Sequence, residues 1–199
     1  MFGFMHGLIN RSIQCFLQDT YGPPLWRSVA EESGVGGDGF EAMLNYEDRL
    51  TDDVLGAACR HLDKSREALL EDMGTYLVSN PRLENLRRLL RFGGSNFLQF
   101  LHSLDDLRGR AKLAVDDLDL PDLEVIDDSP VAFRLECRWH WPGSGHLMTG
   151  LLRAMADDYG ALVLLEVQDA RNGVETVVVE LLDSAFSEGR SFDLAARAG

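Results

Sequence analysis

Two side chains in the segment FLHSLDDLRGR, Phe100 to Arg110, have the chemistry of a binding site. A histidine such as His102 offers a ring nitrogen that coordinates metals and exchanges protons near neutral pH. An arginine such as Arg108 stays protonated and holds carboxylates or phosphates through paired hydrogen bonds. The functional question is which of the two side chains the surrounding helix turns toward the protein interior.

The spacing of apolar residues predicts one amphipathic helix over residues 95–108 that ends at Gly109. With about 100° of rotation per residue, one apolar stripe runs along this helix. The stripe contains Phe97, Leu101 and Leu104. Arg108 lies within the stripe, whereas His102 lies roughly 120° away, on the flank beside Asp106. The arginine, rather than the histidine, therefore faces the predicted core.

Both residues have a structural and a functional interpretation. His102 fits a boundary histidine that hydrogen-bonds an acid or a carbonyl group, and its functional alternative is a metal ligand. Arg108 fits a residue of the last helical turn whose guanidinium extends to solvent at the negative end of the helix dipole. Its functional alternative is a buried cation that clamps an anionic ligand. At this point both alternatives stay open.

The elements that would position these residues are helical in the first half of the chain. Apolar residues recur there at helical spacing, and Thr51 and Ser65 are the predicted N-caps of two helices. Before the helix that contains Arg108, the predicted helices lie in HGLINRSIQCFLQDTYG, PPLWRSVAEESG, TDDVLGAACRHLDK, SREALLEDMGTYLVSN and RLENLRRLLRFGG.

After Pro121 the pattern becomes strand-like. DLEVIDD and VAFRLECRWHW alternate, GHLMTGLLRAMADDYG is typical of a helix, and two further strands meet at a turn around Asn172 and Gly173. The inward face of the second strand is predicted to hold Val131, Phe133, Leu135, Cys137, Trp139 and Trp141. Helices followed by antiparallel strands predict an α+β fold. Residues 184–199 are expected to form a loose tail.

The composition argues against several classes of function. Nineteen basic and 33 acidic residues give a net charge of −14, which repels nucleic acid and anionic membranes. No apolar run reaches the roughly 20 residues of a membrane span, and the first residues lack a signal-peptide cleavage site. The scattered Cys15, Cys59 and Cys137 suggest reduced thiols, and hence a cytoplasmic protein.

From about Met5 to Asp183 the chain resembles the H-NOX family of heme nitric oxide/oxygen-binding domains, also called HNOB. The segment MHGLINRSIQCFLQDTYG is similar to the opening helix of that family, and FLHSLDDLRGR to its proximal heme helix. Pro121 matches a proline that contacts the porphyrin. The segment PGSGHLMTGLLRAMADDYG resembles the helix that follows the propionate-binding strand.

The resemblance implies a fold, a cofactor and a mode of action. It implies one domain over residues 1–183, with a helical lobe at about 1–64 and a lobe of helices on a small antiparallel sheet at about 65–183. Heme is the cofactor of the family. A ligand in the pocket would shift the lobes and be read by a partner, such as a histidine kinase or a cyclic-di-nucleotide enzyme.

The family's heme-binding residues do not carry over. Its proximal histidine falls on Arg108, whose protonated guanidinium has no lone pair for iron. Its Tyr-x-Ser-x-Arg triad, which holds the heme propionates, falls on Cys137, Trp139 and Trp141. The two indoles either fill the space of the porphyrin or line a pocket for another apolar or anionic ligand. His102, Cys137 and His146 are the alternative candidates for an axial ligand.

These observations predict a stand-alone, cytoplasmic sensor domain of the H-NOX type that has lost the usual heme ligation. The alternative is a true heme-based NO or O₂ sensor with a non-standard axial ligand. An enzyme is the weakest hypothesis, because the sequence contains no nucleophile elbow and no phosphate-binding loop. Neither nucleic acid nor a membrane is expected as a partner.

Overall fold

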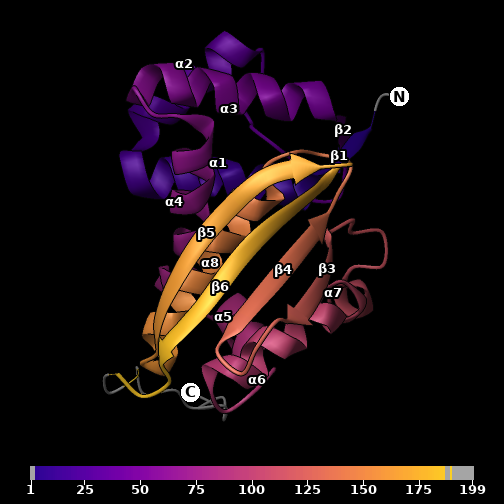
Figure 1. Ribbon diagram of the computed structural model, residues 1–199. Coiled ribbons are helices and arrows are strands. Elements are labelled where there is room, and N and C mark those ends of the chain that lie inside the picture. Colours follow the sequence, from indigo (N-terminus) through magenta and orange to yellow (C-terminus); the bar gives the residue numbers. More distant parts are fainter. Residues whose placement is uncertain (1–2, 187–188, 190–199) are drawn as a thin grey trace, which may run out of the picture.

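The computed structural model describes residues 3–186 and 189, and it shows a helical N-terminal part connected to a curved antiparallel sheet (Figure 1). The N-terminal part contains β1 (Phe4–His6), α1 (Gly7–Tyr21), α2 (Pro23–Ser33), β2 (Asn45–Glu47) and α3 (Asp48–Leu62). The middle contains α4 (Arg66–Ser79), the 3-10 turn η1 (Pro81–Leu83), α5 (Glu84–Arg91), α6 (Phe97–His102), the 3-10 turn η2 (Ser103–Asp106) and α7 (Leu107–Ala114). The last part contains β3 (Asp122–Asp127), β4 (Ala132–Arg138), α8 (Ser144–Tyr159), β5 (Leu162–Arg171) and β6 (Val174–Asp183).

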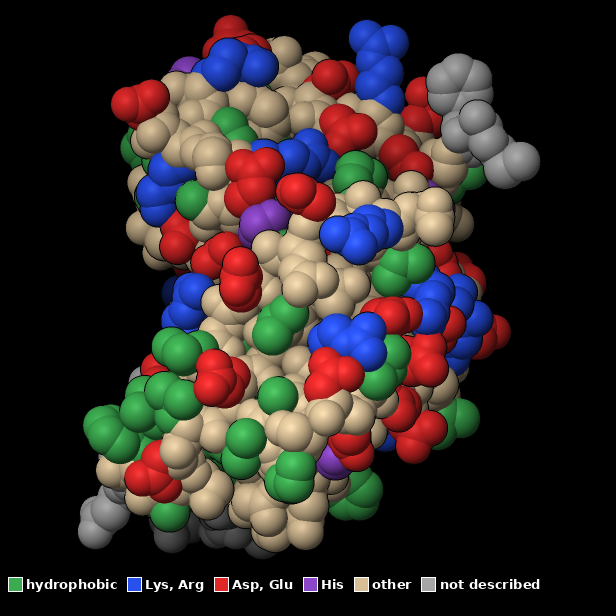
Figure 2. Space-filling model, in the orientation of Figure 1, with side chains coloured by type: hydrophobic (Ala, Val, Ile, Leu, Met, Phe, Trp, Pro, Cys, Tyr) green, Lys and Arg blue, Asp and Glu red, His purple; other side chains and the backbone are tan. Residues whose placement is uncertain are grey.

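The four-stranded sheet has the order β3-β4-β6-β5, and all its neighbouring strands are antiparallel. The β5–β6 hairpin turns at Asn172 and Gly173, both with positive φ, as predicted. Helix α8 lies against one face of the sheet (Figure 1). The other face carries charged side chains of both signs, with apolar ones gathered over one end of β5 and β6 (Figure 2). The α+β fold predicted from the sequence is thus confirmed.

The buried apolar side chains form two clusters. The sheet cluster joins the predicted helix to the strands, because Leu101, Leu104, Phe133 and Leu135 all belong to it. The helical cluster contains the apolar faces of α1 to α3, the first part of α4 and, from far along the chain, Trp141. Val131 was expected on the inward face of β4, but it precedes the strand and is 51% exposed.

Helices α4 and α8 cross at two glycines. A Cβ atom on Gly74 would lie 2.1 Å from the backbone oxygen of Leu147, and one on Gly150 would lie 1.9 Å from that of Glu71. Real Cβ atoms do not approach backbone atoms so closely, so each position requires glycine. The glycine pair therefore brings the two helix backbones into contact and fixes how α8 sits under the sheet.

Several predicted helix boundaries need correction. The helix was expected to end at Gly109, but helical structure continues through the 3-10 turn η2 and α7 to Ala114. Gly109 is an exposed residue within α7 and keeps a helical conformation. Thr51 is not an N-cap: α3 begins at Asp48, and the buried Thr51 hydroxyl donates to Asn10 Oδ1 at 2.7 Å. Ser65 does cap α4, as predicted.

Two other expectations concern the chain as a whole. Of the tail predicted at residues 184–199, positions 187–188 and 190–199 lie outside the described residues. Within the described part of the chain, no helix combines the length and the apolar character needed to cross a bilayer.

Candidate functional site

Arg108 is neither a free surface residue nor a fully buried cation. It is the second residue of α7, its side chain is 38% exposed, and its Nη2 atom donates to Asp119 Oδ1 at 2.6 Å. Its Nε atom is buried and faces no hydrogen-bond partner within the described residues. The Arg108 guanidinium is thus engaged by a carboxylate of the loop that leads to β3.

Asp119 organises the polar contacts around this arginine. Its second oxygen, Oδ2, accepts a hydrogen bond from Trp139 Nε1 at 3.1 Å and lies 3.2 Å from His140 Nδ1. Asp119 was not predicted as a site residue, because it lies in a loop without periodicity. The only available signal was its position two residues before Pro121, which is buried directly ahead of β3.

An open cavity of ≈ 480 Å³ borders this cluster. Its lining consists of Arg108, Asp119, Asp122, Arg138, Trp139, His140, Asn172, Gly173 and Val174. Charged groups of both signs make up about half of this lining, and Trp139 contributes its one indole. Such a cavity favours a polar or charged ligand over an apolar one.

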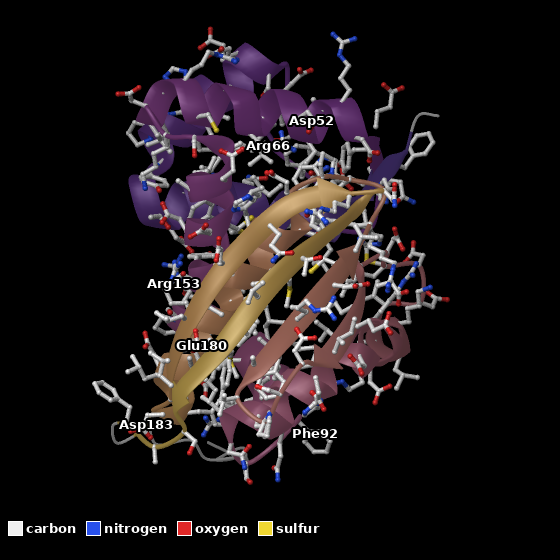
Figure 3. The ribbon with its side chains drawn as sticks, viewed as in Figure 1. Asp52, Arg66, Phe92, Arg153, Glu180 and Asp183 are labelled. Atoms are coloured by element: carbon white, nitrogen blue, oxygen red, sulfur yellow. The ribbon has the colours of Figure 1, made fainter. Side chains whose placement is uncertain are left out.

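The two tryptophans lie beyond the end of β4, where strand alternation no longer applies. Trp141 is 4% exposed and packs in the helical cluster, where its Nε1 donates to Asp52 Oδ1 at 3.0 Å. The Arg66 guanidinium lies 4.6 Å from the centroid of its ring and also binds Asp52 (Figure 3). Trp139 is only half-buried and meets Trp141 edge-on, with ring centroids 5.6 Å apart.

Cys137 is buried in the sheet cluster, as its place in the alternation of β4 predicts. Burial raises the pKa of its thiol to about 12, and the nearby Glu175 carboxylate adds to this rise. The side chain is therefore a neutral thiol at physiological pH. A metal ligand or a nucleophile requires the thiolate form, which this environment strongly disfavours.

The candidate histidines both contact carboxylates. His102 is 42% exposed, faces Asp127 at 3.5 Å and touches the Phe133 ring edge-on, which agrees with the boundary interpretation. His146, in the first turn of α8, lies with its Nδ1 atom 3.3 Å from Glu71 Oε1. Among the described residues, no group of three or more His, Cys, Asp or Glu side chains is arranged to hold a metal ion.

The N-terminus of α8 binds a carboxylate of the chain itself. Glu175 on β6 accepts hydrogen bonds from the Gly143 amide, the Ser144 hydroxyl and the Gly145 amide at 2.8, 2.8 and 2.7 Å. These donors and the helix dipole make a favourable anion position. Glu175 pairs directly with Cys137 across the sheet, so this internal anion lies beside β4.

Comparison with known proteins shows to which family this chain belongs. The family model described as Haem-NO-binding, HNOB, matches residues 6–167. An H-NOX protein from K. algicida in the Fe(II) unliganded state superimposes with a TM-score of 0.76 at 14% identity, covering 95% of this chain and all of that one. A mutant H-NOX protein from S. oneidensis gives 0.76 at 13% identity, covering 90% and 97%. The chain belongs to the HNOB family.

The curated relatives are soluble guanylate cyclases. The chain is 24% identical over 180 residues to soluble guanylate cyclase gcy-31 of Caenorhabditis elegans, which covers 89% of this chain and 26% of that protein. It is 22% identical over 174 residues to soluble guanylate cyclase 89Db of Drosophila melanogaster, which covers 85% and 26%. The chain thus spans about a quarter of the length of these relatives. The matched region includes most of the residues that the HNOB family model covers.

Proposed function

We propose that this chain is a cytoplasmic H-NOX-type regulatory domain that works without heme. The observation that carries the proposal is the Arg108–Asp119 ion pair, at the residue on which the family resemblance implies that the proximal histidine falls. A guanidinium has no lone pair to offer to iron, and one of its nitrogens is held by the Asp119 carboxylate.

The other positions that would have to receive a heme also fit it poorly. Trp141 is part of a packed apolar cluster, and Trp139 supports it from the side. The donors at the start of α8 are taken by Glu175. Cys137 is a neutral buried thiol, and His102 is turned toward Asp127. We therefore derive no iron chemistry for this chain.

The cavity beside Arg108 is the place where we expect a small ligand to bind. Its mixed charges and its single indole wall favour a polar anion or zwitterion of low molecular mass. We further propose that the ligand state is read by a signalling protein such as a histidine kinase or a cyclic-di-nucleotide enzyme. The sensory role of the family supports this step.

The proposal predicts how the protein responds to added hemin. Wild-type protein should give no saturable change in absorbance at one hemin per chain and no rise in melting temperature, since ligand binding to the folded state alone would raise it. Arg108→His, which restores an imidazole, should behave in the same way because the two indoles still occupy the space. Titration followed by absorbance and thermal unfolding measures both responses.

Two results would contradict this account in different ways. Stoichiometric binding by the wild-type protein would show that another residue ligates the iron, and loss of binding in His102→Ala would identify it. Stoichiometric binding by Arg108→His alone would show that the pocket is intact and that only the ligand was exchanged.

A further inference from the structure

The two edges of the four-stranded sheet are protected to different degrees. At the β3 edge, η2 lies alongside the strand, and the Val125 amide donates to Asp105 Oδ1 at 2.8 Å. β5 forms the opposite edge, with α8 behind it (Figure 1). Within the described part of the chain, no hydrogen bond joins the β5 backbone to a group outside the β5–β6 pair. An edge of this kind is a template for a further strand.

The sequence of β5 does little to block such pairing. The strand runs from Leu162 to Arg171 and is longer than the typical strand of about 5–6 residues. It contains neither proline nor lysine, two residues with which natural edge strands prevent pairing. Its register with β6 shifts between Leu162 and Val163 and between Gln168 and Arg171, at the two ends of the strand. The stretch from Val163 to Gln168 therefore offers a regular edge to a partner.

The hydrophobic core is incomplete along the same edge. Val177 and Val179 of β6 pack in the sheet cluster and are 0% exposed. Their neighbours across the ladder, Val167 and Leu165, lie on the same face but are only partly buried, as is Val163. A further strand beside β5 would place its own inward side chains against these three residues of β5. Burial of this apolar surface would favour binding.

The outer face of the β5–β6 pair combines apolar and acidic side chains (Figure 2). Leu164 and Leu182 are 55% and 50% exposed. Glu180 lies directly opposite Leu164 in the ladder, and Glu166 follows Leu164 on the same face of β5 (Figure 3). Among the described residues, neither Glu166 nor Glu180 has an ion-pair partner. Two carboxylates on neighbouring strands thus lack a cation, which a basic partner would supply.

The surrounding charges select the kind of partner. Arg134, on the adjacent strand β4, is already engaged by Asp128 and Glu136. With a net charge of −14, the chain repels nucleic acid and anionic membranes. A second copy of the chain also fits poorly, because a symmetric interface brings the same acidic patch from both copies together. A protein segment that carries basic residues is the occupant that these charges favour.

We propose that the β5 edge binds an extended segment of a partner protein in which apolar and basic residues alternate. The backbone of this segment pairs with β5 and adds a fifth strand to the sheet. Because side chains alternate between the two faces, its apolar residues cover the partly buried side chains of β5. Its lysine or arginine residues lie on the outer face, near Glu166 and, one strand further, Glu180. This inference rests on the proposed reading of the domain by a partner protein, but it depends on neither the ligand nor the absence of heme.

A synthetic peptide in which valine and lysine alternate over about ten residues, the length of β5, is the probe that tests the proposal. Fluorescence anisotropy of the labelled peptide, titrated with the full chain, measures its affinity. Hydrogen–deuterium exchange locates the site: amides of residues 162–171 should exchange about two- to fivefold more slowly with the peptide, and those of β3 should not change. A peptide with glutamate in place of lysine should not bind.

Two modifications separate strand pairing from general charge attraction. When alternate backbone amides of the peptide are methylated, one of the two alternating sets should abolish binding and the other should keep it, because only one side of a strand faces β5. Glu166→Lys combined with Glu180→Lys should weaken binding about tenfold, since it replaces two attractive contacts by repulsive ones. Glu31→Lys combined with Glu41→Lys, two exposed acids of the helical part, changes the net charge equally and should have little effect.

Each result decides for or against the β5 edge as the binding site. Binding that protects β5, requires one set of peptide amides and is lost in the Glu166/Glu180 variant supports it. The proposal is wrong if the basic peptide does not bind, if both methylated peptides bind equally well, or if the two double variants weaken binding to the same extent. It is also wrong if the protein alone associates through β5, since a second copy would then occupy the edge. None of these results bears on heme, which the hemin titration tests separately.

Discussion

Replacement of Trp141 by alanine is expected to lower the free energy of unfolding by about 3–5 kcal/mol, the range for a large buried aromatic side chain. Trp141 is 4% exposed, packs in the helical cluster and carries the Arg66 guanidinium on its ring. Its removal leaves a cavity where the segment that follows β4 enters this cluster. Equilibrium unfolding in urea gives the value directly.

Two variants separate the contributions of Trp141. Trp141→Phe keeps a buried ring and loses only the hydrogen bond to Asp52, so it should cost about 1 kcal/mol plus a small packing loss. Trp139→Ala should cost less than Trp141→Ala, because Trp139 is half-buried and covers the other ring from outside. If Trp139→Ala lowered the free energy of unfolding as much as Trp141→Ala or more, Trp139 rather than Trp141 would make the larger contribution to stability.

The second large effect is expected at the α4–α8 crossing. Gly150→Ala places a methyl group where the Glu71 backbone oxygen lies 1.9 Å away, and neither backbone has room to move without separating the helices. The cost should reach about 3 kcal/mol, the upper part of the range for overpacking. Thermal or urea unfolding of the variant measures it.

Gly56→Ala provides a matched control within another helix. Gly56 lies in the middle of α3, and its added Cβ would meet only the flexible end of Arg60 at 3.4 Å. Alanine is the better helix former, so this change should stabilise the protein by about 0.5–1 kcal/mol. If both substitutions shifted stability in the same direction, helix propensity rather than the crossing would dominate, and our description of the α4–α8 contact would be wrong.

Apolar periodicity was sufficient to predict the core between helix and sheet. Leu101 and Leu104 recur at helical spacing, while Phe133 and Leu135 alternate, and burial of each set on one face brings them together. The turn at Asn172 and Gly173 was predictable for a local reason, since both residues adopt positive φ readily. The apolar faces and the turn depend on residues close together in the sequence, so they can be predicted from the sequence.

The candidate site depends on contacts that periodicity does not contain. The 3-10 turn η2 changes the rotation between His102 and Arg108, so a uniform helix misplaces the arginine. Asp119 lies in a loop and acts only because α7 and the end of β4 converge on it. Trp141 follows the alternation of β4 in sequence but packs in the other cluster, since the strand ends at Arg138. The positions of Arg108, Asp119 and Trp141 all depend on tertiary packing, which the sequence pattern does not show.

The heme content of the full chain, purified from cells supplied with heme precursors, tests the central claim most directly. The ion pair between Arg108 and Asp119, together with the buried Trp141, predicts a colourless protein without a Soret band and with a heme-to-protein ratio near zero. A protein that carries one heme per chain, with a Soret band that persists through gel filtration, would contradict the account.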